Sequence, residues 1–318
     1  MKYSSSVPWG VGSMVATCLS TMVQAGVPMD LPYPKGEPTA EEIITQVYFV
    51  NHFYALKNVS IEMDGKTVTV IIYKSEGGKP TTNTLKRYLN NDYSDGVVKA
   101  KDLAIFTSGK ERGMGMLITD YVDDEKSQSY QVWVPELRKI RLFSQPPHND
   151  AWGGTDFTFG DVTLRKPAHE THQLLGKEKF PDCLTVMEVG PDDRNWYMKT
   201  LPEAPVCDHK DKQVYKVKST TKFTDWWYDY RISYIDTKTF GDYRTEYFKG
   251  DKKVKFIDRD WGSLDTPDPR ALYWKFWYGK NLVTNHETMA LVPREVFRFN
   301  TDKKASLWTE ETLTQIHR

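Results

Sequence analysis

The feature that most constrains the fold is a series of short segments in which apolar and polar residues alternate. The stretch 113–162 holds one alternating segment, an acidic turn, two more such segments and a loop rich in glycine and aromatic residues. Alternation with a period of two is typical of strands that bury one face, and turns between short strands favour antiparallel pairing. The stretch therefore predicts antiparallel β-structure, and it contains no catalytic motif.

The C-terminal half continues this pattern with an aromatic segment at 226–235. The residues that alternation places on one predicted face are Trp226, Tyr228, Tyr230, Ile232 and Tyr234. Two return strands are predicted at 243–248 and 253–257, which would complete a meander. Many short strands with few helices favour a curled antiparallel sheet.

One helix is predicted near the N-terminus, from Thr39 to about Tyr54. Thr39 is followed by Glu41 and Glu42, and this order is typical of an N-cap with acidic residues in the first turn. The apolar residues at helical spacing are Ile43, Ile44, Val47 and Val50. Such a helix has one apolar face, with which it could cover an open sheet.

The first 25 residues have the pattern of a cleaved signal peptide. Lys2 supplies a positive start, 11–22 is small and apolar, and 23–25 reads Val-Gln-Ala. The apolar run is shorter than the roughly 20 residues of a membrane-spanning helix. We therefore expect an exported, periplasmic protein whose folded part is 26–318, and the alternative is an amphipathic N-terminal stretch of a cytosolic protein.

Two cysteines, Cys183 and Cys207, would remain after cleavage. In an oxidising compartment they can form a disulfide, whose loop closure is worth about 3–4 kcal/mol in the chain-entropy model. The spacing alone leaves two free thiols as the alternative. No Cys-x-x-Cys motif occurs, so the sequence gives no support for redox catalysis.

The charge balance argues against a nucleic-acid partner. Lysine and arginine together number 43, and aspartate and glutamate together also number 43. A chain without a strong net charge has no overall field that would attract a polyanion. The sequence also lacks phosphate-binding and dinucleotide-binding motifs, so we expect neither a cofactor nor an enzymatic activity.

The best candidate for metal chemistry is the pair His169 and His172. The His-x-x-His spacing could place two imidazoles together, and Asp161 or Glu178 could add an oxygen ligand. The zinc-protease motif has a different spacing, His-Glu-x-x-His, so the alternative is a polar surface turn. A metal-dependent hydrolase that uses this loop is one alternative function.

The aromatic stripe of 226–235 has two interpretations. Aromatic strands usually pack in a core, but amphipathic rings on a concave sheet can also line a cavity for acyl chains. Met114 and Met116 would add an adaptable apolar surface to such a cavity. The three residues 226–228 could instead form a platform for sugar stacking, so a glycan-binding module is a second alternative function.

The stretch 113–162 also resembles the LolA-like family of outer-membrane lipoprotein-sorting proteins. The similar features are a glycine-containing strand that enters an acidic turn at 113–125, and an aromatic strand that ends in Trp-Val-Pro-Glu-Leu-Arg-Lys at 133–139. A small-residue loop leading to Asp-Phe-x-aromatic-x-Asp follows at 153–161. Weaker similarity at 234–248 and 299–313 extends the resemblance over most of the mature chain.

The resemblance implies an unclosed antiparallel β-barrel covered by an N-terminal helix and short helical lid segments. It implies one domain, 26–318, with an insertion around 176–212, and a periplasmic carrier or chaperone in lipoprotein or lipid trafficking. Its partners would be a lipid or lipoprotein cargo and an inner-membrane exporter or outer-membrane acceptor. The resemblance implies no set of catalytic residues. The residues expected to line the hydrophobic cavity are Met114, Met116, Ile118, Trp226, Tyr228, Tyr230, Ile232 and Tyr234.

Overall fold

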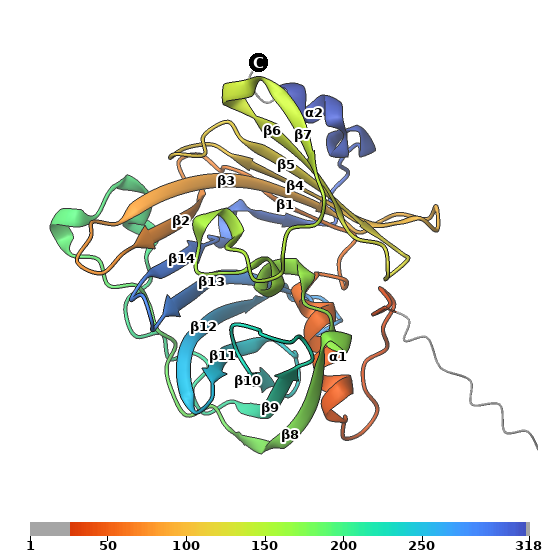
Figure 1. The fold of residues 1–318 in the computed structure, drawn as a ribbon, viewed down its shortest axis with the longest axis vertical. Helices are drawn as coiled ribbons and strands as arrows, with labels where there is room; N and C mark the ends of the chain where they lie inside the picture. The colour runs from red at the N-terminus through yellow and green to blue at the C-terminus, as the bar shows by residue number, and fades with distance from the viewer. Residues whose placement is uncertain (1–25, 316–318) are drawn as a thin grey trace, which may run out of the picture.

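The computed structural model describes residues 26–315, so the predicted signal peptide lies outside the described residues. Within this range fifteen strands form one continuous antiparallel sheet (Figure 1). The strands are β1 (Asn58–Ile61), β2 (Thr69–Lys74), β3 (Thr81–Asn90), β4 (Val98–Phe106), β5 (Gly115–Tyr121), β6 (Ser129–Val134), β7 (Lys139–Phe143), β8 (Glu170–Lys179), β9 (Gln213–Thr221), β10 (Tyr230–Asp236), β11 (Asp242–Lys249), β12 (Lys252–Ser263), β13 (Leu272–Asn281), β14 (Glu287–Leu291) and β15 (Phe297–Phe299).

The sheet curls strongly but does not close. Its order is β7-β6-β5-β4-β3-β2-β14-β13-β12-β11-β10-β9-β8, and β1 joins from the side by pairing with β3 and β15. The end strands β7 and β8 do not pair with each other, so the curled sheet keeps an open side (Figure 1). The predicted unclosed antiparallel barrel is confirmed.

The helix α1 (Ala40–Asn51) lies on the concave side of the sheet, next to β8 (Figure 1). Its start has the predicted cap, because the Thr39 hydroxyl accepts a hydrogen bond from the Glu42 amide and the Glu42 carboxylate accepts one from the Thr39 amide. The helix ends at Asn51, three residues before the predicted end. Among the described residues no helix is long and apolar enough to cross a membrane.

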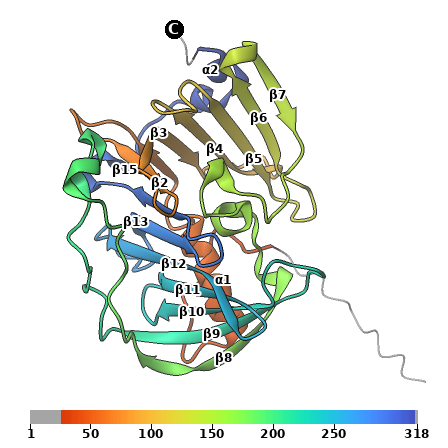
Figure 2. The same cartoon turned by 60° about the vertical axis from the view of Figure 1, so that its left-hand side comes forward.

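Two connections cover the middle of the sheet, one on each face. The covering segment (residues 150–165) runs across the concave side between the two halves of the sheet (Figures 1 and 2). The outer connection (residues 180–212) packs on the convex side, where Met187 and Met198 join a core with Ile72 and Tyr278. Because both faces are covered, the central strands β2, β13 and β14 are apolar on both faces.

The C-terminal helix α2 (Glu310–Gln315) covers the outer face of β5, β6 and β7. Trp308, just before the helix, packs with Leu103 of β4 and Leu117 of β5, and its indole donates a hydrogen bond to the Tyr88 carbonyl at 2.8 Å. The opposite face of β4 and β5 therefore forms part of the concave side of the sheet.

The prediction for 226–235 was wrong in two respects. The strand β10 begins only at Tyr230, so the first four residues of the segment lie outside it. The buried residues of the strand are the odd-numbered ones, Arg231, Ser233 and Ile235, together with Asp236 at its end, and Arg231 faces α1. Tyr230, Ile232 and Tyr234 therefore face away from the concave side. The polar residues can be buried because each finds a partner, as described below.

Candidate functional site

An apolar cavity of about 80 Å³ lies between the concave face of the sheet and the covering segment. Its walls come from the central strands and from the covering segment itself, and they are mainly aliphatic and aromatic. Representative lining residues are Ile71, Ala104, Phe106, Met116, Ile118 and Trp277. The charged residues in the wall, Arg87 and Asp102, form an ion pair with nitrogen–oxygen distances of 2.6–3.1 Å. The space is therefore suited to an apolar ligand.

The alternation of β4 and β5 builds one wall of this cavity. Asp102, Ala104 and Phe106 of β4 point inward, and Ala104 is paired across the sheet with Met116 of β5. Leu103, between them, points to the opposite face and packs against Trp308. The small side chain of Ala104 leaves space that a larger residue would fill.

The covering segment closes the cavity with aromatic side chains. The Phe157 ring meets the Trp277 ring edge to face, with 5.4 Å between the centroids, and the Trp152 ring lies 6.4 Å from the Phe106 ring. Gly279 permits this approach, because a Cβ at that position would come within 2.8 Å of the Phe157 ring. The segment is thus packed closely against β13.

Polar contacts hold the same segment in place. The Asp156 carboxylate accepts a hydrogen bond from the Thr288 hydroxyl at 2.7 Å and lies 2.6 Å from the His286 ring nitrogen. The Thr158 amide and hydroxyl both donate to the Asp161 carboxylate, at 2.9 and 3.0 Å. These bonds connect the covering segment to β14 and fix the turn that precedes Asp161.

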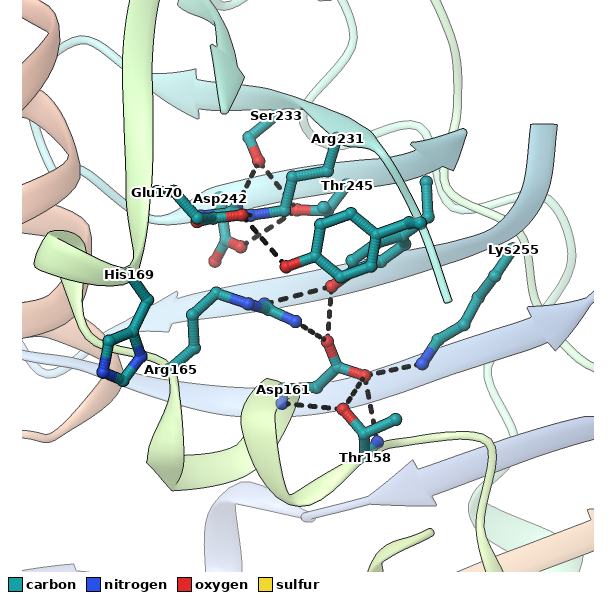
Figure 3. A network of polar contacts seen from close by, with 12 residues as sticks. Thr158, Asp161, Arg165, His169, Glu170, Arg231, Ser233, Asp242, Thr245 and Lys255 are labelled. Carbon is teal, nitrogen blue, oxygen red and sulfur yellow. Dashed lines mark hydrogen bonds and ion pairs between the residues drawn. The ribbon is translucent and has the colours of Figure 1, made fainter. Parts of the chain in front are cut away.

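Asp161 is the centre of a buried ion-pair network (Figure 3). Arg165 and Lys255 approach its two carboxylate oxygens at 2.7 and 2.6 Å, and the Tyr247 hydroxyl donates to it at 2.5 Å. The Asp161 side chain is completely buried. Lys255 lies on β12 and Tyr247 on β11. The network therefore connects the covering segment to these two strands of the sheet.

A second buried pair lies beside it, between Glu170 of β8 and Arg231 of β10. The two form a two-pronged contact, with the shortest distance 2.7 Å, and the Tyr228 hydroxyl donates to Glu170 at 3.0 Å. Arg231 also donates to the Ser233 hydroxyl at 2.9 Å (Figure 3). The polar face of β10 is therefore buried with its hydrogen bonds satisfied.

The network keeps its carboxylates ionised despite their burial. Burial raises the pKa of Asp161, but Lys255 and Arg165 outweigh it and hold that pKa well below its usual value. Burial likewise raises the pKa of Glu170, while Arg231 and Arg165 lower it to about 2. Burial lowers the pKa of Lys255, and the attraction of Asp161 partly offsets this shift.

The structure brings together only some of the predicted cavity residues. Met116 and Ile118 line the apolar cavity, and Met114 packs close by against the cluster of Phe106. Trp226 and Tyr228 belong to an aromatic cluster that also contains Phe157 and Trp277, without lining the cavity themselves.

The other three predicted residues lie on the outer face of β10. Tyr230 stacks on Phe248 with 4.9 Å between the ring centroids, and Tyr234 meets Phe180 at 5.8 Å. Ile232 shares this face by alternation, so none of the three lines the cavity. Cys183 and Cys207 form a disulfide in the outer connection.

The histidines of the metal hypothesis are already engaged by neighbouring groups. The His169 Nδ1 accepts a hydrogen bond from the Lys166 amide, and the two His172 ring nitrogens contact the Ser219 hydroxyl and the Pro167 carbonyl. Burial lowers the pKa of His169 to about 4. Asp161 is held by Arg165 and Lys255, as described above. Between residues 26 and 315 no three histidine, cysteine or acidic side chains are grouped for a metal ion.

Sequence reasoning did not predict the charged network of the site, although it named Asp161 as a possible metal ligand. Its residues come from distant parts of the chain, namely Asp161, Arg165, Glu170, Arg231, Asp242, Lys255 and Arg259. In the sequence they stand in alternating strands and loops, where a charged residue normally indicates a solvated face. The one available signal was a charged residue surrounded by aromatic ones, as around Arg231.

Comparison with solved structures defines the class of fold as LolA-like. A domain assigned to outer membrane lipoprotein sorting from Vibrio parahaemolyticus has a TM-score of 0.61 at 13% identity, over 86% of this chain and 98% of that one. A DUF1329 family protein from Desulfovibrio piger has a TM-score of 0.62 at 14% identity, over 87% and 100%. A LolA superfamily protein from Nitrosomonas europaea has a TM-score of 0.51 at 12% identity, over 87% and 100%.

At these low identities the comparisons show similarity of fold. For the fold, they confirm the resemblance that was inferred from residues 113–162. A family model described only as an uncharacterized protein matches residues 99–315, about two thirds of the chain. The chain therefore belongs to that family. No curated protein matches the sequence.

Proposed function

We propose that this protein binds and carries a lipid, a lipoprotein acyl chain or another hydrophobic molecule. The observation that supports this most directly is the apolar cavity on the concave side, beneath the covering segment. An apolar cavity with few polar groups binds through burial of apolar surface, at about 25 cal/mol per Å². The role needs no chemical step and therefore no catalytic residue.

Carrying a long chain requires the covering segment to move. The cavity measures about 80 Å³, whereas pockets that hold drug-sized ligands measure about 300–1,000 Å³. The covering segment is held by two aromatic contacts, by the ion pair of Asp161 with Lys255 on β12 and by side-chain hydrogen bonds to β11 and β14, and not by strand pairing with the sheet. Its displacement would enlarge the cavity while leaving the hydrogen bonds of the sheet intact.

The proposed place of action is the periplasm, between an inner-membrane exporter and an outer-membrane acceptor. The signal-peptide pattern of residues 1–25 and the disulfide between Cys183 and Cys207 both favour an exported protein. The solved structure from Vibrio parahaemolyticus, which is assigned to outer membrane lipoprotein sorting, agrees with this setting.

The test fills the cavity with one side chain. Ala104→Phe places a ring in the space next to Met116, and we expect the affinity for the neutral fluorescent probe N-phenylnaphthylamine to fall roughly tenfold or more. The measurement is a fluorescence titration of purified residues 26–318.

The matched control is Leu103→Phe, on the same strand but on the opposite face, against Trp308. Both variants overpack the protein and should lose about 1–3 kcal/mol of stability, so stability alone does not separate them. If Ala104→Phe binds the probe as the wild type does, the cavity is not the ligand site and the proposal is wrong.

A further inference from the structure

A polar cavity of about 50 Å³ adjoins the apolar one. Val162 and Thr163 of the covering segment line both, so the two cavities meet beneath the same stretch of chain. Helix α1 contributes Ile44 and Val47 to the polar cavity, and the sheet contributes the charged side chains Arg231, Asp242 and Arg259. A charged compartment thus continues directly from an apolar one.

Buried charges of both signs surround the polar cavity. Four cations of the network, Arg165, Arg231, Lys255 and Arg259, face three carboxylates, Asp161, Glu170 and Asp242. Lys166, which also lines the cavity, is paired with Asp124. Each of the four cations contacts a carboxylate, and Asp161 is shared by Arg165 and Lys255.

Arg259 is the cation with unused hydrogen-bonding capacity. It is 3% exposed and donates through Nη1 to Asp242 at 2.5 Å. Its Nε is buried and, among residues 26–315, has no hydrogen-bond partner. The guanidinium lies 4.0 Å from the centre of the Trp277 ring, which itself lines the apolar cavity. Arg259 thus lies at the border of the two cavities.

Two indole groups at this border are also unpaired. The Nε1 atoms of Trp274 and Trp277 are buried without a partner in the described part of the chain, and both residues line the apolar cavity. A buried donor without an acceptor costs about 1–3 kcal/mol. Unpaired indole donors beside a guanidinium with an unpaired N–H would be satisfied by an acceptor that carries a negative charge.

We propose that the ligand is a single-chain amphiphile with an acidic head group. Its tail would lie in the apolar cavity, and its carboxylate or phosphate would bind Arg259 at the border, close to the indoles of Trp274 and Trp277. This inference rests on the proposed carrier function and adds the class of ligand to it. Because Arg259 is pre-positioned by Asp242 and by stacking on Trp277, it need not be reoriented to bind the head group.

The experiment compares ligands with the same tail and different heads. Palmitate, hexadecyl phosphate and hexadecanol are titrated against the bound neutral probe in the full mature chain. We expect at least one acid to displace the probe about 10- to 100-fold more strongly than the alcohol does, the effect of a charge-assisted hydrogen bond. The stronger acid identifies the head group as a carboxylate or a phosphate.

Arg259→Gln should remove this preference, so that the acids displace the probe no more strongly than hexadecanol does. The matched control is Arg244→Gln, which breaks another buried pair, with Asp258, on the outer face of the sheet. The control should keep the preference for the acid. Equal loss of preference in both variants would overturn the assignment of Arg259.

The double variant Trp274→Phe with Trp277→Phe serves if Arg259→Gln does not fold. It keeps the rings and removes only the two N–H groups, and we expect the preference for the acid to fall several-fold. An unchanged preference in the double variant would overturn the inference. If the wild type binds all three ligands equally, only the acidic head group is refuted. If it takes up neither these ligands nor the neutral probe, the carrier function itself fails.

Discussion

At the scale of single residues, buried charges on β10 decide which face of the strand points inward. Arg231 is 6% exposed and its partner Glu170 is 3% exposed, and the pair also involves Tyr228 and Ser233. A buried charge is tolerated only when it is paired and hydrogen-bonded. Since Glu170 lies 61 positions away in the chain, the pairing depends on the neighbouring strands being in register.

Removing one member of this pair should destabilise the protein strongly. Glu170→Gln leaves the Arg231 charge buried without its partner, and we expect a loss of about 3–5 kcal/mol in the free energy of unfolding. Urea denaturation at pH 7 measures it. The control is Glu37→Gln, which removes an exposed ion pair with Lys177 and should cost at most about 1 kcal/mol. Similar losses in the two variants would contradict the prediction.

The same carboxylate predicts a pH dependence. The pKa of Glu170 is about 2 in the folded protein, against an ordinary value of 4.5. A lowered pKa stabilises the fold above the ordinary value, and this stability is lost as the pH falls from about 4.5 towards 2. In urea titrations at a series of pH values, Glu170→Gln should lose less stability over this interval than the wild type. If stability falls with pH in parallel in the two proteins, Glu170 does not contribute to the pH dependence of stability.

At the scale of elements, α1 is the part whose sequence and structure agree best. The N-cap at Thr39 with acidic residues in the first turn was predicted from the sequence, because the capping interaction joins residues three apart. The covering segment is the opposite case. Its short helical turns at 152–154 and 160–164 depend on contacts with β12, β13 and β14, and local sequence carries little sign of them.

The cap of α1 can be tested on its own. Thr39→Ala removes the hydroxyl that accepts from the Glu42 amide, and we expect a loss of about 0.5–2 kcal/mol in stability. Thermal unfolding followed by circular dichroism measures the change. Thr45→Ala, within the same helix, should be neutral or slightly stabilising, because alanine has the higher helix propensity. A larger effect at position 45 than at 39 would contradict the assigned helix start.

At the scale of the whole molecule, one sheet connects all parts of the described chain. We propose that residues 26–318 form a single folding unit, with the outer connection as an insertion between β8 and β9. The disulfide joins two positions 24 residues apart within this connection, and the connection packs on the convex face of the central strands. Stability of the insertion and of the sheet should therefore be coupled.

The disulfide provides the test of this coupling. The variant with Cys183→Ala and Cys207→Ala should unfold in one transition and lose about 3 kcal/mol, because the unfolded chain gains entropy. Calorimetry on both proteins, with and without a reductant, measures this. Reductant should shift the wild type towards the variant and leave the variant unchanged. Two separate transitions in the wild type would refute the single unit.

The residue patterns predicted a curled antiparallel sheet with one N-terminal helix, because short alternating strands, turns and a helix cap are local patterns, and the family resemblance added the unclosed barrel. Of the residues predicted to line a ligand cavity, Met116 and Ile118 of β5 lie in the wall of the apolar cavity, and their role in binding stays a prediction. Only the tertiary structure decided which face of β10 is buried and where the cavities lie. The physical reason is that alternation separates two faces without saying which faces inward. That choice depended on partners for Arg231, Asp161 and Arg259 from strands far apart in the chain.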